Sequence, residues 1–217
     1  MLNLNNVTLL SISCDKIEQT KRAIDISTRN IEFKQVKFLT NEDIKMNGVD
    51  IIKIDKLDKD GYNTFMVKEL YKYIETDFVQ IIQWDGFVLN EKSWRDEYFN
   101  FDYIGAPWWL NDEFNVGNGG FSLRSKKFLD FIHQLSPLET KNYKELDGNK
   151  ASGFTPEDAV LCRYYGKFLK DVGFKFAPES LASIFSIEGN PKFGYNWKDQ
   201  FGFHGPSVQN MPISFQG

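Results

Sequence analysis

The stretch VTLLSISCDKIEQTKRAIDISTR, residues 7–29, decides the fold class. It begins with a compact apolar run rich in β-forming side chains. Apolar residues then recur at roughly helical spacing, at Ile17, Ala23, Ile24 and Ile26. This pattern predicts a strand that leads directly into a helix.

The same alternation continues through the first half of the chain. Short β-forming runs at residues 32–39, 49–54 and 78–82 predict three more strands, and a helical pattern at residues 62–74 precedes the last of them. Strands that alternate with helices indicate an α/β fold in which helices cover both faces of a mainly parallel sheet.

Ligands of such a sheet bind beside the carboxyl ends of its strands. Ser13, Asp15 and Thr40 follow the first two strands, and Asp85 follows the strand at residues 78–82. Asp85 is the leading candidate for a metal ligand, because its carboxylate comes directly after an apolar strand. Asp-Gly is also a common turn pair, so a structural turn is the alternative interpretation.

Composition limits the classes of protein to consider. With 217 residues, 41% hydrophobic and 16% aromatic, we expect one globular domain. A net charge of -4 and a pI near 5.3 argue against a nucleic-acid partner, because binding to a phosphate backbone needs clustered Lys and Arg.

Cys14 and Cys162 are expected to be free thiols. Without a signal-peptide pattern or a membrane-length apolar run, we expect a cytoplasmic protein with no integral membrane segment.

The glycine-rich segment NVGNGGFSLRS spans residues 115–125. It matches neither a Walker loop nor the dinucleotide-binding fingerprint. Glycine lets a backbone approach a ligand closely, so Asn118, Gly119 and Gly120 are candidates for contact with a sugar or phosphate. A tight structural turn is the alternative.

A helix is expected to begin near Thr155 and to end at Gly173. Thr155 can cap the helix and Pro156 suits its first position. Glu157 and Asp158 follow, and one of them could take a proton from a hydroxyl nucleophile. Acids also stabilise the amino end of a helix without any catalytic role.

The chain has two histidines, and their surroundings differ. His204 lies in FGFHG, residues 201–205, where its imidazole could complete a metal site built from a carboxylate and phosphate oxygens. His133 lies within a predicted helix, residues 126–135, and is expected to be structural.

Five motifs together resemble a glycosyltransferase-like family long catalogued as a domain of unknown function. They are QWDG (83–86), DYIGAPW (102–108), GNGGFSLRS (117–125), PED (156–158) and FGFHG (201–205). The resemblance implies a GT-A fold and transfer of a sugar from a nucleotide-diphosphate donor, with a UDP-sugar favoured, to a glycan or other hydroxyl acceptor. It also divides the domain into a nucleotide-binding half (1–100), a donor-sugar and acceptor half (101–205) and a tail (206–217).

The resemblance further implies roles for individual residues. Asp85 and His204 hold Mn²⁺ or Mg²⁺, although Phe87 stands where the second acid of the usual motif is expected. Asp158 acts as the base of an inverting reaction, and Glu157 holds the acceptor or the donor sugar. The expected donor contacts are Ser13, Asp15, Thr40, Lys68, Trp84, Gly86, Asn118, Gly119 and Gly120, and the expected acceptor contacts are Trp108 and Trp109. The alternatives are a catalytically silent sugar- or nucleotide-binding module and a metal-dependent phosphoesterase.

Overall fold

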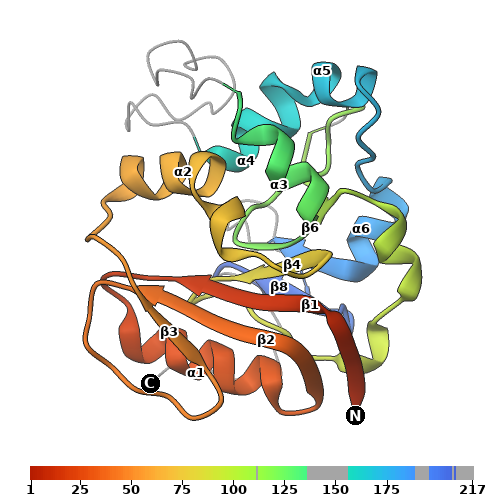
Figure 1. The fold of residues 1–217 in the computed structure, drawn as a ribbon. Coiled ribbons are helices and arrows are strands. Elements are labelled where there is room, and N and C mark those ends of the chain that lie inside the picture. The colour runs from red at the N-terminus through yellow and green to blue at the C-terminus, as the bar shows by residue number, and fades with distance from the viewer. Residues whose placement is uncertain (111, 136–155, 189–195, 207, 209–217) are drawn as a thin grey trace.

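The computed structural model describes residues 1–110, 112–135, 156–188, 196–206 and 208. Its centre is a six-stranded sheet with the strand order β3-β2-β1-β4-β6-β5 (Figure 1). β1 pairs in parallel with β2 and β4, β2 pairs in parallel with β3, and β6 is antiparallel to both β4 and β5. The mainly parallel sheet expected from the sequence is therefore present. The strands are β1 (Leu2–Ile12), β2 (Ile31–Thr40), β3 (Asp50–Lys53), β4 (Phe78–Ile82), β5 (Tyr103–Gly105) and β6 (Phe121–Ser125).

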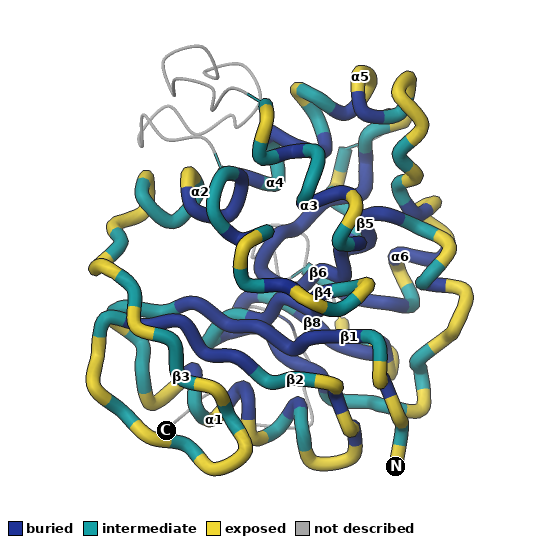
Figure 2. Tube along the Cα trace, viewed as in Figure 1, coloured by how far each residue is buried: buried dark blue, intermediate teal, exposed yellow. Residues whose placement is uncertain are grey.

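Helices cover both faces of the sheet, with α1 (Ile17–Thr28) on one side and α2 (Lys59–Lys68) and α3 (Lys126–Ile132) on the other (Figure 1). Adjacent residues of β1 face opposite ways: Leu9 joins the core cluster that contains α1, and Leu10 joins the cluster that contains α2 and α3. A strand that is buried on both faces has a nearly continuous apolar sequence. Figure 2 shows that the central strands are buried along most of their length.

Two predicted helices differ from the observed ones. The helix expected at residues 62–74 starts earlier, because the side chain of Asp58 caps α2 by accepting a hydrogen bond from the Gly61 N–H at 2.7 Å. It continues after α2 as a 3-10 helix, η1 (Leu70–Tyr73).

The helix expected near residues 155–172 is divided into three parts, and Thr155 lies outside the described residues. α4 (Glu157–Ala159) leads into a π-helical segment, η5 (Val160–Tyr164), and then into α5 (Gly166–Asp171). Gly173, at φ +100°, ends the helix as expected.

The C-terminal part of the chain returns to the carboxyl end of β4. Short 3-10 helices, η2 (Glu91–Ser93) and η3 (Asp96–Asn100), follow β4 in the sequence, and α6 (Glu179–Phe185) precedes a small parallel sheet of β7 (Ser186–Glu188) and β8 (Gly202–His204). Phe203 of β8 packs edge-to-face on Phe87, with ring centroids 4.8 Å apart. This packing places β8 beside the turn that follows β4. Within the described residues, no helix is both long and apolar enough to span a membrane.

Candidate active site

A tight turn carries Asp85 away from the end of β4. The N–H of Gln83 donates to the carbonyl of Gly86 at 3.1 Å, and the N–H of Gly86 donates back to the carbonyl of Gln83 at the same distance. The turn interpretation of this segment is therefore confirmed, and a role of Asp85 in a metal site stays a prediction. Phe87 is buried against the core, so the position where a second acid was expected does not face the site.

His204 meets Asp85 and Gln83 on one side of its ring. Its Nε2 lies 3.5 Å from Oδ1 of Asp85 and 3.0 Å from Oε1 of Gln83. On the opposite side, its Nδ1 lies 3.1 Å from Oε2 of Glu188. Asp85 and His204, far apart in the sequence, thus converge as predicted, and Gln83 and Glu188 complete the cluster.

Two glycines make room for the imidazole ring. A Cβ on Gly120 would lie 2.1 Å from Nε2 of His204, and a Cβ on Gly86 would lie 2.8 Å from its Cδ2. Gly86, Asn118, Gly119 and Gly120 are all buried. Contact of these four residues with the donor stays a prediction; the structure shows that the space where side chains would lie on Gly119 and Gly120 holds Glu157 and His204.

Substituting Gly120 by alanine is expected to weaken Mn²⁺ binding by about tenfold or more, because the new Cβ displaces the histidine ring. Isothermal titration calorimetry measures this affinity. Gly61→Ala is a matched control, since the Cβ it introduces would lie 3.1 Å from the Asp58 carboxyl and in ordinary contact, at 3.5 Å and 3.7 Å, with the Leu57 side chain. Equal affinities for the Gly120 variant and the wild type would contradict the assignment of His204.

The charge around His204 favours a cation. Burial lowers the pKa of His204, but the negative charges of Glu188, Asp85 and Asp158 outweigh it and raise that pKa to about 9. A ring protonated on both nitrogens can donate to Glu188 on one side and to Gln83 on the other. The same negative field would attract a metal ion.

The donor atoms beside His204 suit a divalent cation. Oδ1 of Asp85 is buried and accepts no hydrogen bond, and it shares its side of the ring with the Gln83 amide oxygen. Carboxylate, amide oxygen and imidazole are ligands that Mn²⁺ and Mg²⁺ accept. Among the described residues, no cluster of three or more His, Cys, Asp or Glu side chains could hold a metal by itself. A cation here would therefore need oxygen ligands from a substrate or water.

Glu157 lies in a buried ion pair with Arg124, a contact that the sequence did not predict. Its carboxylate receives two hydrogen bonds from the buried guanidinium of Arg124, at 2.6 Å and 3.0 Å. Its Oε1 would lie 2.0 Å from a Cβ on Gly119, so Gly119 makes room for this ion pair. Burial lowers the pKa of Arg124, but Glu157 more than compensates and the net pKa lies above its ordinary value.

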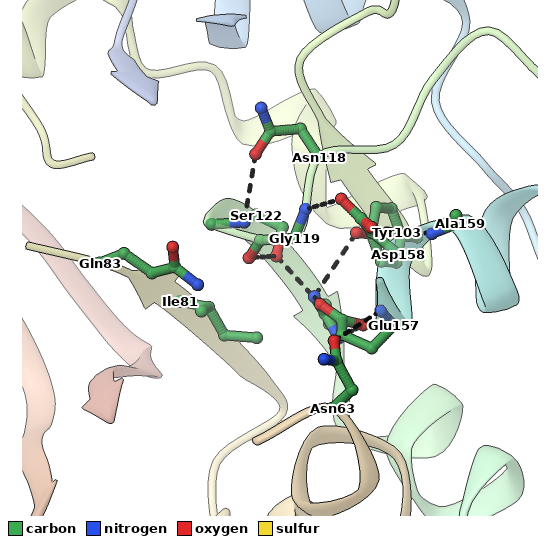
Figure 3. Close-up of polar contacts among 12 residues, drawn as sticks. Asn63, Ile81, Gln83, Tyr103, Asn118, Gly119, Ser122, Glu157, Asp158 and Ala159 are labelled. Carbon is green, nitrogen blue, oxygen red and sulfur yellow. Dashed lines mark hydrogen bonds and ion pairs between the residues drawn. The ribbon is translucent and has the colours of Figure 1, made fainter. Parts of the chain in front are cut away.

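Asp158 points the other way, toward the glycine-rich segment (Figure 3). Its Oδ2 accepts a hydrogen bond from the Gly119 N–H at 2.8 Å, and its Oδ1 accepts one from the Ala159 N–H at 2.8 Å. Asp158 is only partly buried, and its charge contributes to the raised pKa of His204. A fixed carboxylate therefore lies within electrostatic range of the Asp85–His204 pair.

A pocket of about 460 Å³ lies at the carboxyl ends of β1 and β4. Ser13, Asp15 and Trp84 line it, as expected of donor contacts. The ammonium of Lys16 lies 5.5 Å from the centre of the Trp84 ring. The lining residues that the sequence did not indicate include Lys56, Lys59, Tyr62, Asn63 and Gln83.

Two expected donor contacts do not reach this pocket. Thr40 is fully buried and its hydroxyl accepts a hydrogen bond from the Glu42 N–H. Lys68 donates to the backbone carbonyl of His133 at 2.8 Å, because the last turn of α2 packs near the end of α3. Thr40 and Lys68 therefore do not line the pocket that contains Ser13, Asp15 and Trp84, and their contact with the donor stays a prediction.

The two tryptophans differ in surroundings. Trp108 lies over Gly117 and lines a second pocket, of about 550 Å³, together with Glu188. Trp109 is 47% exposed and does not line that pocket. Trp108 is thus the better placed of the two to contact a ligand near the site.

Comparison with known proteins assigns the chain to a family. The model of a family described as "Protein of unknown function (DUF5672)" matches residues 49–204, which is well over half of the chain. The chain belongs to this family. The matched part of this DUF5672 protein includes Asp85, Asp158 and His204. No curated protein matches the sequence.

Solved glycosyltransferases share the fold of this DUF5672 protein. One is the galactosyltransferase LgtC, solved in complex with donor and acceptor sugar analogues. Its structure matches this chain with a TM-score of 0.60 and 13% sequence identity, and the match covers 93% of this chain and 88% of that chain. Another is a glycosyltransferase involved in the glycosylation of the major capsid of PBCV-1. Its structure matches with a TM-score of 0.50 and 14% sequence identity, and the match covers 91% of this chain and 92% of that chain. These likenesses confirm the expected GT-A fold.

Proposed function

We propose that this DUF5672 protein is a metal-dependent glycosyltransferase that moves a sugar from a nucleotide-diphosphate donor, with a UDP-sugar favoured, to a hydroxyl acceptor. One observation carries the proposal: Oδ1 of Asp85 and Nε2 of His204 lie 3.5 Å apart, beside a pocket at the carboxyl ends of two parallel strands. The shared GT-A fold supports the same class of reaction.

The pocket lined by Ser13, Asp15 and Trp84 is where we place the nucleoside of the donor. Lys56 and Lys59 line the same pocket and can meet a diphosphate locally, even though the whole chain is acidic. Gln83 also lines it and faces His204, so the diphosphate would lie between the pocket and the histidine.

Asp85 and His204 would hold the cation, and the amide oxygen of Gln83 is a third ligand within reach. Gln83, two residues before Asp85, offers an amide oxygen and not a carboxylate, so metal binding rests on the single carboxylate of Asp85. When bound, the cation would neutralise the charge that develops on the departing nucleoside diphosphate.

Asp158 is the proposed base. Two backbone N–H groups fix its carboxylate, and its charge contributes to the raised pKa of His204. It would take the proton of the acceptor hydroxyl while that oxygen bonds to the anomeric carbon and the bond to the diphosphate breaks. Attack opposite the leaving group inverts the anomeric configuration. The pocket beside Trp108 is where we place the acceptor, whose apolar ring face can stack on the indole.

The test is release of nucleoside diphosphate from UDP- and GDP-sugars with Mn²⁺ or with EDTA. We expect turnover with a UDP-sugar that EDTA abolishes, and a roughly 100-fold loss in Asp158→Asn, because general-base catalysis contributes at least this much. Asp25→Asn, an exposed acid on α1, is the matched control and should retain wild-type turnover.

Other outcomes point to other functions. Donor binding without release or transfer, with metal present, would indicate the catalytically silent binding module. A product that keeps the donor's anomeric configuration would reject Asp158 as an inverting base. Metal-independent turnover would reject the cation but not sugar transfer.

A further inference from the structure

Glu188 and His204 are held side by side by the backbone. Glu188 ends β7, His204 ends β8, and the two residues are direct partners in the parallel pairing of these strands. The carboxylate oxygens of Glu188 lie 3.1 Å and 3.4 Å from Nδ1 of the ring. Both side chains are about 20% exposed, so water competes little for this contact.

The ring lies between hydrogen-bond acceptors. Glu188 offers carboxylate oxygens at Nδ1, while Gln83 and Asp85 offer oxygens at Nε2, at 3.0 Å and 3.5 Å. To bind a cation the ring must be neutral, and a neutral imidazole carries only one N–H, so the acceptors then compete for it. If the proton resides on Nδ1, the lone pair of Nε2 faces Asp85 and can bind a cation. If it resides on Nε2, the ring donates to Gln83 or Asp85 and cannot bind a cation there.

Gln83 cannot turn freely to relieve this competition. Its amide nitrogen donates to the hydroxyl of Tyr62 at 2.8 Å, which points its amide oxygen toward His204. In the absence of Glu188, the oxygens of Gln83 and Asp85 would therefore favour the tautomer that is protonated on Nε2. Glu188 is the group that opposes this preference.

We propose that Glu188 is a positioning residue for His204: it accepts the Nδ1 proton, fixes the ring plane and leaves Nε2 as the cation ligand. The role of Nε2 as cation ligand rests on the proposed function, whereas the contact between Glu188 and Nδ1 does not. Glu188 acts through the histidine and needs no contact with the reacting atoms. Sequence reasoning missed it because no motif includes it.

The matched pair Glu188→Gln and Glu188→Ala tests the proposal. Both variants lose the negative charge, but the amide oxygen of glutamine still accepts the Nδ1 proton. Mn²⁺ affinity, measured by calorimetry, is expected to fall by about 10- to 100-fold in Glu188→Ala and by no more than about threefold in Glu188→Gln. Equal losses in the two variants would mean that charge alone matters, and would overturn the positioning role.

Imidazole ¹⁵N spectra show which ring nitrogen of His204 carries the proton. A merely structural role of Glu188 would leave this unchanged. The chain has two histidines, so His133→Gln leaves His204 as the only signal. With Mg²⁺ present, we expect the proton on Nδ1 in the wild type and in Glu188→Gln, and on Nε2 in Glu188→Ala. Near-ultraviolet circular dichroism and thermal melting check that all variants are folded.

The two proposals fail in different ways. If the wild type binds Mn²⁺ and the variants behave as described, but no nucleotide sugar is turned over, then the proposed function fails and the role of Glu188 stands. If the wild type turns over a donor with metal, but Glu188→Ala keeps both its Mn²⁺ affinity and its tautomer, then the role of Glu188 fails alone.

Discussion

Turnover of the donor is expected to fall by about 1000-fold or more in Asp85→Ala, because a bound cation contributes several kcal/mol to stabilising the leaving group and each 1.4 kcal/mol is a factor of ten in rate. Asp85 supplies a carboxylate oxygen 3.5 Å from Nε2 of His204, and the described residues contain no larger cluster of acids, histidines and cysteines that could replace it as a metal site. A site with one carboxylate and one imidazole cannot lose the carboxylate and keep its affinity. Nucleoside diphosphate release at saturating donor measures the effect.

Three further measurements make the Asp85 result specific. Asp25→Ala should retain full turnover, since that acid is exposed on α1. Calorimetry should show the loss of Mn²⁺ binding directly in Asp85→Ala. Raising the Mn²⁺ concentration should recover part of the activity if the defect lies in affinity. Undiminished, metal-dependent turnover in Asp85→Ala would reject Asp85 as the ligand.

Breaking the Arg124–Glu157 ion pair is expected to lower the free energy of unfolding by about 3–5 kcal/mol in Glu157→Ala, because an unpaired charge is left in the core. The side chain of Arg124 is fully buried and that of Glu157 is 4% exposed. Arg124 also donates to Ser122 and stacks on Tyr103, so the guanidinium cannot move to solvent without disrupting other contacts. Urea unfolding measures the change.

A double variant separates the charge from the packing. Arg124→Met combined with Glu157→Leu removes both charges and keeps most of the volume, so it should recover most of the stability lost in Glu157→Ala. Glu157→Gln, which keeps hydrogen-bond acceptors for Arg124, should lie between Glu157→Ala and the wild type if the alanine variant is too unstable to purify. A double variant no more stable than Glu157→Ala would show that the pair is not the source of the effect.

The first four strands and the first helix were predictable because their signal is local, whereas β5 to β8 were not predicted. Residues 78–82 form an apolar β-branched run, and β4 occupies those residues. The helical spacing of apolar residues from Ile17 to Ile26 likewise predicted a helix here, and α1 spans Ile17–Thr28. The start of α2 was missed because its position depends on capping by Asp58 rather than on hydrophobic spacing.

The glycine-rich segment shows where sequence reasoning fails. Its glycines indicate that something must lie against the backbone, and that much was correct. Whether the neighbour is a ligand or a protein side chain depends on residues far away in the sequence. For Gly119 that neighbour is Glu157, and for Gly120 it is His204.

By itself, the sequence determined the α/β class and the strand that delivers Asp85, and it singled out Asp85, Asp158 and His204 as candidates. These follow from periodicity along one segment and from the chemistry of rare side chains. Only the tertiary structure decided which groups face one another: Glu157 turns to Arg124, Lys68 to the carbonyl of His133, and Glu188 and Gln83 to His204. The physical reason is that the partner of a buried polar group is set by the packing of strands and helices from distant parts of the chain, and no local pattern encodes that choice.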